Sequence, residues 1–248
     1  MAAEQDGMTD AGLSFGAVAR AYELARPTYP GEVVDWLVPR GAHRIIDLGA
    51  GTGKFARALV DRGLDVVGVE PSAGMRETFA SAVSGATVIA GSAEDIPLVD
   101  ASVDAVVVAQ AWHWVDPMRA VPEIARVLRP GGSLGLVWNT RDESEPWVAA
   151  LSDVLAQYAV PNELESEPEV GPPFGPLERC EVRWSNPMTA DGVVELFGSR
   201  SYLITLSPEE RAEALQQVRA LIMSHPDTIG RKEIRMPYVT RAFRTELK

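Results

Sequence analysis

Residues 44–53 read RIIDLGAGTG, and this stretch decides the fold. Its apolar run carries an acid, Asp47, near the end and is followed at once by glycines, as in a buried parallel strand that feeds a loop. Phe55 and Leu59 then lie four residues apart, on one face of a helix that Thr52 is placed to cap. Strand, glycine loop and helix in this order predict the first half of a βαβ unit.

The same alternation continues along the chain. Short apolar runs are separated by segments of helical spacing, and the helix predicted over 120–128 ends at the Pro-Gly-Gly of 130–132. Strands that alternate with helices favour a parallel sheet with right-handed crossovers. The further strands predicted in this part of the chain are 65–69, 86–90, 103–109 and 133–138.

The last third of the chain has a different pattern. Residues 161–176 contain five prolines and two glycines and are not expected to form a regular element. Ser-Pro-Glu-Glu at 207–210 predicts a capped helix, with Leu215, Val218 and Ile222 as its buried stripe. The last strand is expected to pair antiparallel at the sheet edge. The other elements predicted here are helices over 145–159 and 190–200 and strands over 179–186 and 232–240.

The charge of the chain limits its partners. Its 248 residues include 23 basic and 35 acidic side chains, which gives a formal net charge of −12. Because such a chain is not attracted to a phosphate backbone, general nucleic-acid binding is not expected. Residues 231–248 are a local exception, with six basic and two acidic side chains, and we interpret them as the solvated face of a terminal strand.

Cysteine and histidine are scarce. The single cysteine, Cys180, excludes disulfide frameworks and cysteine-based zinc sites, and His43, His113 and His225 show no metal-ligand spacing, so no metal site is expected. The start of the chain lacks the pattern of a signal peptide, and the most apolar stretch, 103–109, is too short to cross a bilayer. We therefore expect a cytoplasmic protein with no membrane partner.

The candidate site lies where the predicted strands end, because ligands of open α/β sheets bind beyond the carboxyl ends of the strands. The loop 49–53 brings backbone N–H groups and the start of a helix to this edge. Glu70 ends the second predicted strand and is placed to hold the two hydroxyls of a ribose. In a dinucleotide fingerprint G-x-G-x-x-G counted from Gly49 and Gly51, the third glycine position is Lys54, which argues against a nicotinamide cofactor.

Four motifs then occur in order: IIDLGAGTGKFARALVDRG (45–63), VVGVEPSAGM (66–75), GSAEDIPLVDASVDAVVVAQAWHW (91–114) and EIARVLRPGGSLGLVWN (123–139). Together they resemble a class I S-adenosylmethionine-dependent methyltransferase of the type 11, small-molecule branch. The opening SFGAVARAYELARPTYP (14–30) is also similar to that branch, including relatives that methylate carboxylates such as trans-aconitate. The resemblance covers roughly residues 14–141.

The resemblance implies S-adenosylmethionine as cofactor and assigns residues to it. Asp47 corresponds to the acid that supports the amino group, Glu70 to the ribose clamp, and Tyr22 and Arg26 to an N-terminal lid. Ser92 stands where the family often has an aspartate, so its contact with the adenine depends on a hydroxyl. The other positions that the resemblance places at the cofactor are Gly49, Ala50, Gly51, Gly53, Pro71, Met75, Ala93, Glu94 and Gln110.

Aromatic and polar residues after the fourth and fifth predicted strands are the candidates for the acceptor site: Trp112, His113, Trp114, Trp138, Asn139 and Arg141. His113 is the candidate general base, although a carboxylate acceptor is ionised at neutral pH and needs none. Each has a plainer interpretation. The tryptophans suit core packing, His113 suits a helix cap near Asp116, and Arg141 suits a surface ion pair with Asp142 or Glu143.

The expected protein is therefore an α/β enzyme with a Rossmann-like, doubly wound, mostly parallel seven-stranded sheet, an antiparallel last strand and helices on both faces. Residues 1–248 are expected to form one domain: a cofactor-binding core at 14–141, acceptor-side helices and the proline-rich loop at 142–230, and a closing strand at 231–248. The predicted reaction is in-line methyl transfer to a small molecule, with a carboxylate as one candidate. The alternatives are a non-catalytic S-adenosylmethionine binder and a nicotinamide-dependent oxidoreductase.

Overall fold

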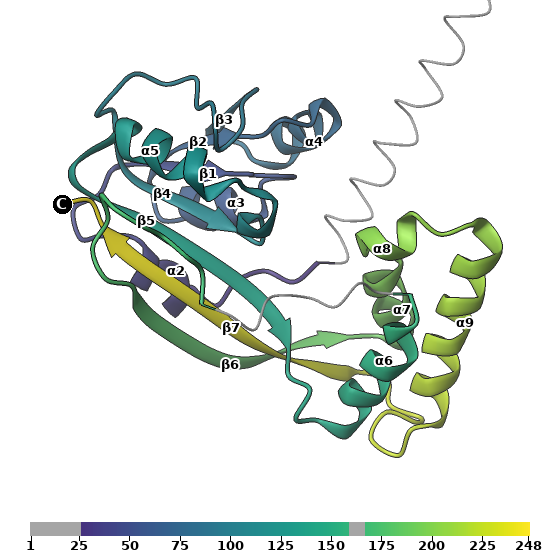
Figure 1. The fold of residues 1–248 in the computed structure, drawn as a ribbon. Helices are drawn as coiled ribbons and strands as arrows, with labels where there is room; N and C mark the ends of the chain where they lie inside the picture. Colours follow the sequence, from purple (N-terminus) through teal and green to yellow (C-terminus); the bar gives the residue numbers. More distant parts are fainter. Residues whose placement is uncertain (1–25, 159–166) are drawn as a thin grey trace, which may run out of the picture.

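A seven-stranded sheet in the order β3-β2-β1-β4-β5-β7-β6 runs through the molecule (Figure 1). The structure is a computed structural model that describes residues 26–158 and 167–248. Within those ranges the strands are β1 (Arg44–Leu48), β2 (Asp65–Val69), β3 (Ala86–Ile89), β4 (Val103–Ala109), β5 (Leu128–Arg141), β6 (Glu178–Met188) and β7 (Ile234–Glu246). The helices there are α2 (Gly31–Leu37), α3 (Lys54–Val60), α4 (Ala73–Ala82), α5 (Pro117–Val127), α6 (Pro146–Ala156), α7 (Ala190–Gly198), α8 (Ser201–Ile204) and α9 (Pro208–Ser224), with a 3-10 turn η1 (Trp112–Trp114).

The strand directions confirm the expected Rossmann-like sheet. β1 pairs in parallel with β2 on one side and β4 on the other, so the strand order reverses between β1 and β4. β7 is antiparallel to both β5 and β6. The expectation that the last strand lies at the edge is wrong. Because β5 occupies one side of β7 over residues 238–246, β6 can add only to the other side of β7, and β6 becomes the edge strand.

Helices cover both faces of the sheet, because alternate strand residues point to opposite sides. Ile46 and Val106 pack with the buried stripe of α5 in one core cluster. Ile45 and Val107 pack with α2, α3 and α4 in another, which includes the fully buried Phe79. In the described ranges, no helix combines the length and apolar character needed to pass through a membrane.

A third core cluster lies at one end of the long strands. Figure 1 shows α6, α7, α8 and α9 gathered beyond the end of β5, around the first half of β7. Because β7 runs antiparallel, its first residues lie at the carboxyl ends of the parallel strands, and Tyr238 is opposite Arg141. Trp147, Phe197 and Tyr238 are among the buried side chains that hold this helical unit to the sheet. The unit is therefore placed beside the ligand-binding edge.

Several predicted boundaries differ from the observed ones. Gly53, not Thr52, is the N-cap of α3, and Thr52 is buried instead. The capping box of Ser207 and Glu210 is confirmed. The buried stripe of α9 contains Val218 and Ile222 as predicted, but its first member is Ala214, and Leu215 is only partly buried. β5 and β7 extend beyond their predicted ranges because each is paired along both of its sides.

Gly53 is expected to be a strong determinant of stability. Its φ is +85°, and a Cβ there would lie 2.5 Å from Val83 Cγ2 and 2.6 Å from Phe79 Cδ2. Gly63 has a similar φ of +77° but no atom within 4 Å of an added Cβ. Gly53→Ala should therefore lower the free energy of unfolding by at least about 1 kcal/mol more than Gly63→Ala, because overpacking adds to the same backbone strain. Urea denaturation measures both, and equal losses would contradict the packing role of Gly53.

Candidate functional site

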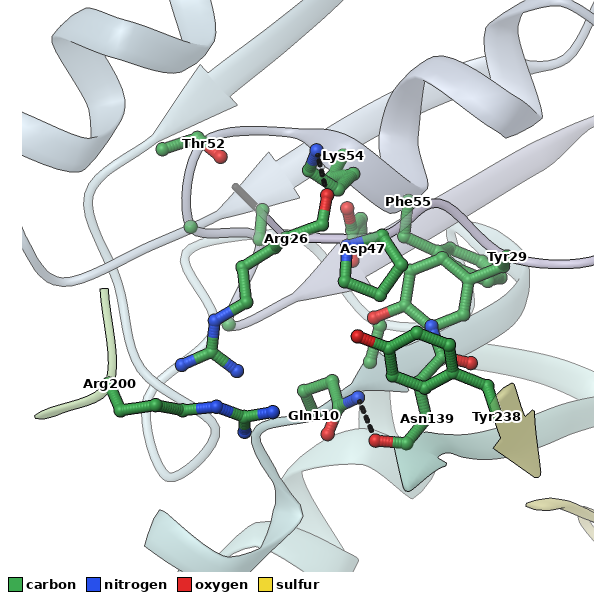
Figure 2. A pocket seen from close by; sticks show the side chains of 15 residues that line it. Arg26, Tyr29, Asp47, Thr52, Lys54, Phe55, Gln110, Asn139, Arg200 and Tyr238 are labelled. Atoms are coloured by element: carbon green, nitrogen blue, oxygen red, sulfur yellow. Dashed lines mark hydrogen bonds between the residues drawn. The ribbon is translucent and has the colours of Figure 1, made fainter. Parts of the chain in front are cut away.

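A pocket opens at the carboxyl edge of β1, β4 and β5 (Figure 2). Together with the open solvent at its mouth, it takes up about 570 Å³. Backbone from the glycine loop forms one wall, and side chains from the helical unit and β7 reach the opposite part. The lining residues are Arg26, Pro27, Tyr29, Asp47, Gly49, Ala50, Gly51, Thr52, Lys54, Phe55, Ala109, Gln110, Asn139, Arg200 and Tyr238.

The glycine loop forms its wall through left-handed backbone. Gly49 and Gly51 have φ of +70° and +54°, which other residues adopt only with strain. A Cβ on Gly49 would lie 2.8 Å from Ala111 Cβ, whereas a Cβ on Gly51 would meet nothing within 4 Å. Gly51 therefore leaves space on the pocket side. Gly53, which was predicted at the cofactor, packs against α4 and does not line the pocket.

Asp47 is the buried acid of the pocket. Its side chain is 1% exposed, and Oδ2 accepts a hydrogen bond of 2.9 Å from the N–H of Ala56 in α3. Oδ1 has no hydrogen-bond partner among the described residues. Burial raises the pKa of Asp47 to about 7, the negative charge of Glu70 adds to the rise, and the bond from Ala56 opposes it. The site therefore holds one buried carboxyl oxygen, Asp47 Oδ1, that has no donor among the described residues.

Glu70 braces the glycine loop from the end of β2. Its Oε2 accepts from Gly51 N–H at 2.9 Å, and its Oε1 accepts from Ser72 N–H at 2.8 Å. Each oxygen keeps a further lone pair for a ligand hydroxyl. Glu70 is buried and does not line the pocket itself, and beyond it Pro71 is exposed and Met75 is half-buried at the start of α4.

The loop after β3 lies outside the pocket lining. Ser92 forms an isolated bridge with Asp95, and Ala93 is buried in the core. Glu94 Oε1 accepts from Asp116 N–H at 3.0 Å. Although partial burial acts to raise its pKa, hydrogen bonds from Asp116 and Ser92 lower the pKa of Glu94 overall. The Glu94 carboxylate thus ties this loop to the start of α5.

Residues 26–30, called the crossing segment here, run over the pocket from α3 to β5. Lys54 Nζ donates to the carbonyl oxygen of Arg26 at 2.7 Å, and Asn139 Nδ2 donates to that of Thr28 at 3.0 Å. The ring of Tyr29 meets Phe55 edge-on at 5.0 Å. Arg26 is therefore held at the pocket, as Figure 2 shows, while Tyr22, the other predicted lid residue, lies outside the described residues.

Gln110, the residue after β4, and Asn139, near the end of β5, both line the pocket. Gln110 Nε2 donates to the carbonyl oxygen of Asn139 at 3.1 Å, and Gln110 N–H donates to Val137 at 2.8 Å. Gln110 has a φ of +60°, a strained value for a residue with a side chain. Strain of this kind is concentrated at functional sites, because neighbouring contacts must hold it in place.

The aromatic candidates do not line the pocket. Trp112, the first residue of η1, is buried in the core, and Trp138 packs edge-on against Phe243 with 6.0 Å between ring centroids. His113 and Trp114 are exposed beside each other, with ring centroids 4.8 Å apart. Desolvation lowers the pKa of His113, so its imidazole is neutral over more of the physiological range. The N-cap of α5 is Asp116, not His113.

Arg141 also lies outside the lining, although it is next to it. Its guanidinium lies 5.0 Å above the centre of the Phe197 ring, and Nη2 donates to Ser152 Oγ at 3.3 Å. The surface ion pair considered for Arg141 is made instead between Asp142 and Arg183, with 3.5 Å between Oδ2 and Nε. Arg141 therefore faces the helical unit.

Comparison with known proteins identifies the family. A family model described as a methyltransferase domain matches residues 46–136. An uncharacterized methyltransferase of Mycobacterium tuberculosis is 48% identical over 238 residues, which are 96% of this chain and 97% of that protein. An uncharacterized methyltransferase-like protein of Schizosaccharomyces pombe is 34% identical over 91% of this chain and 92% of its own length.

The chain belongs to the class I S-adenosylmethionine-dependent methyltransferases. A solved structure from Anaeromyxobacter dehalogenans, assigned as a type II methyltransferase, superposes with a TM-score of 0.63 at 25% identity and covers 89% of this chain and 97% of its own. The family match therefore agrees with the sheet order and with the pocket at the strand ends.

Sequence reasoning missed part of this methyltransferase's pocket. Tyr238 on β7 and Arg200, which follows the C-cap of α7 at Ser199, both line it. Neither carries a motif, and both arrive through long-range packing: Tyr238 by its register opposite Arg141, Arg200 by the helical unit. A signal was present only for Phe55, whose helical spacing predicted a buried face, and for Lys54 at the start of α3.

Asp47→Asn should change how the stability of the ligand-free methyltransferase depends on pH. The folded pKa of about 7 lies above the unfolded value, so protonated Asp47 favours the folded state. This stabilisation is complete below about pH 4 and is lost at up to about 1.4 kcal/mol per pH unit as the pH rises to about 7.

Urea denaturation of both proteins at constant ionic strength checks this. The difference in free energy of unfolding between wild type and Asp47→Asn should fall from about pH 4.5 to about pH 7 and then level off. Other titrating groups cancel in the difference. Parallel curves for the two proteins would show that Asp47 is ionised throughout.

Proposed function

We propose that this methyltransferase transfers the methyl group of S-adenosylmethionine to a small-molecule acid, with a carboxylate as the accepting group. The observation that carries the cofactor part is Asp47 Oδ1, a buried carboxyl oxygen without a partner in the pocket. A buried polar atom requires a hydrogen-bond partner, and the ammonium of an amino-acid ligand is a charged donor of the right kind.

The rest of the pocket fits the other parts of the same cofactor. The guanidinium of Arg26 is suited to its carboxylate, and the open space at Gly51 admits the methionine chain. Glu70 is suited to the ribose hydroxyls because both its oxygens keep acceptor capacity. We extend the proposal to the sequence-predicted positions Pro71, Met75, Ser92, Ala93 and Glu94 as the side on which the ribose and adenine lie.

The chain's own contribution to the reaction is alignment and exclusion of water. When bound, S-adenosylmethionine supplies a methyl group on a positively charged sulfur, whose bond to carbon breaks as the acceptor oxygen bonds to that carbon. The sulfur keeps the electron pair of the broken bond, and a carboxylate becomes an ester with no proton to remove. The crossing segment covers the pocket, and Gln110 and Asn139 fix its floor through their mutual hydrogen bond.

The charges of the pocket support an acidic acceptor. Arg26, Lys54 and Arg200 line it, and among the residues that the structure describes Asp47 is the only acid in the lining. This concentration of positive charge stands out in a chain whose net charge is −12. The net charge of the chain supports a small molecule over a nucleic acid.

The proposal treats the chain as one methyltransferase domain. The core of 14–141 provides the cofactor side, the helices of 142–230 provide the acceptor side, and 231–248 closes the sheet between them. A cytoplasmic location is part of the proposal, since a single free cysteine suits a reducing compartment.

Gly51→Ala should weaken the binding of S-adenosylhomocysteine at least about tenfold, or about 1.4 kcal/mol, because its methyl group occupies the space next to the ligand. Gly41→Ala is the matched control: its φ is +82° and an added Cβ also meets nothing within 4 Å, but Gly41 does not line the pocket. Calorimetry measures both. Equal affinities for the two variants would remove the loop from the cofactor site, and tighter binding of NADH would favour an oxidoreductase.

The acceptor is tested with labelled S-adenosylmethionine and libraries of acids, phenols and amines. Transfer to acids is the expected result, and His113→Ala should then lower kcat less than about tenfold, because no proton is removed and His113 lies outside the pocket lining. If phenols or amines are methylated and the same variant loses about 10²-fold or more, His113 is a general base and the carboxylate proposal is wrong. Binding without transfer to any library member indicates a non-catalytic binder.

A further inference from the structure

Asp47 Oδ1 is closed off from solvent, although the proposed function has a ligand bonded to it. The residue is 1% exposed, and this oxygen is buried. β1 and α3 are held in place by the core and by the bond from Ala56 to Asp47. The crossing segment contributes Arg26, Pro27 and Tyr29 to the lining without being part of a helix or strand. It is therefore the cover that has to move before a ligand reaches Asp47.

The bond from Asn139 to the crossing segment depends on the orientation of the Asn139 side-chain amide. Nδ2 donates to the carbonyl oxygen of Thr28 at 3.0 Å. If the amide turned by 180°, Oδ1 would face that carbonyl oxygen, and two acceptors repel each other. The oxygen and nitrogen of an amide are similar in size, so packing does not select between the two orientations. A hydrogen bond to Oδ1 is needed to do so.

Thr240 supplies that hydrogen bond from the neighbouring strand. Its Oγ1 donates to Asn139 Oδ1 at 2.6 Å, and the two residues lie directly opposite each other in β7 and β5. Trp184 fixes the direction of this bond, because its indole N–H can only donate and reaches the same Thr240 oxygen at 2.8 Å. Thr240 is fully buried, so the reversed Asn139 amide would leave its hydroxyl proton without an acceptor. Trp184, Thr240 and Asn139 thus form a one-way series of donors that ends at Thr28.

We propose that Thr240 is a positioning residue of this methyltransferase: its hydroxyl fixes the Asn139 amide so that Nδ2 holds the crossing segment in place, and this hold limits how fast the cofactor and its product exchange. The inference rests on the proposed function, since it takes the pocket to be the cofactor site, and it adds control of ligand exchange. Thr240 does not line the pocket and acts through Asn139, which does (Figure 2). Both residues lie beyond the 46–136 that the family model matches, so the arrangement comes from the pairing of β5 with β7.

This role has a distinct kinetic signature. The bond from Asn139 to Thr28 joins two parts of this chain, so it stabilises the covered pocket whether the pocket is filled or not. Movement of the cover precedes both entry and exit of a ligand. Weakening the bond should therefore raise the association and dissociation rate constants by the same factor and leave the affinity unchanged. Damage to the pocket itself would instead speed dissociation and lower the affinity, with no gain in association.

The test measures both rate constants by surface plasmon resonance, with the full chain immobilised and S-adenosylhomocysteine as the analyte. Thr240→Val replaces the hydroxyl by a methyl group, Thr240→Ala removes it without added bulk, and Thr240→Ser keeps it. The matched control is Thr245→Val, because Thr245 is also a buried threonine of β7, 2% exposed. Its Oγ1 donates to the carbonyl oxygen of Gly175 at 2.9 Å, and it does not line the pocket. Circular dichroism confirms that each variant is folded.

We expect Thr240→Val and Thr240→Ala each to raise both rate constants about three- to tenfold, as for loss of one buried hydrogen bond, with the Kd within about twofold of wild type. Thr240→Ser and Thr245→Val should keep both rate constants within about twofold of wild type. Asn139→Ala removes the hold on Thr28 directly. In that background Thr240→Val should change neither rate constant by more than about 1.5-fold, because its effect passes through Asn139.

Three results would overturn the inference. One is unchanged rate constants in the variants of Thr240 that lack the hydroxyl, or an equal change in Thr245→Val. Another is faster dissociation with an equal loss of affinity, which would mean that Thr240 shapes the pocket and not its cover. The third is a full effect of Thr240→Val in the Asn139→Ala background. Wild-type protein that fails to bind S-adenosylhomocysteine refutes the proposed function instead.

Discussion

The hydrogen bond from Ala56 N–H to Asp47 Oδ2 ties the end of β1 to the first turn of α3, and the rest of the site depends on it. It fixes the span of the glycine loop, whose Gly51 N–H then meets Glu70 at the end of β2. Three elements are thereby joined at one edge through two acids. The same bond uses only one oxygen of Asp47, so the arrangement leaves a buried carboxyl oxygen for a ligand. The same burial that leaves this oxygen without a partner raises the pKa of Asp47.

The pocket is completed by parts of the chain that are distant in sequence. The crossing segment, the end of β5, the helical unit and β7 each contribute one or more polar groups. Asn139 illustrates the connection: its Nδ2 donates to Thr28 at 3.0 Å and its Oδ1 accepts from Thr240 at 2.6 Å. Thr240 in turn accepts from Trp184, which stacks on Tyr238. This chain of contacts links the crossing segment, β5, β6 and β7 around the pocket.

The parts of the fold that sequence reasoning predicted are those with local causes. The strand, loop and helix around Asp47 follow from patterning within a few residues, and the parallel core follows from their repetition. The place of β7 did not follow, because the register of an antiparallel strand depends on partners about a hundred residues away, such as Asn139 opposite Thr240. Arg200 and Tyr238 were missed for this reason. Trp112 and Trp138 were predicted at the acceptor from their nearness to strand ends, yet they fill the core, because large apolar rings gain more from full burial than from a pocket wall.

The two edges of the sheet differ in how they resist association with other strands. β3 offers only four residues, too few to template a stable pairing. β6 is eleven residues long and pairs with β7 alone, which makes it the edge at greater risk of recruiting a further strand. Its sequence counters this with alternating charges at Arg179, Glu181 and Arg183 and a proline at 187, which lacks a backbone donor. A second strand arriving there would have to desolvate those charges, so the long sheet that carries the pocket is protected against aggregation along its open side.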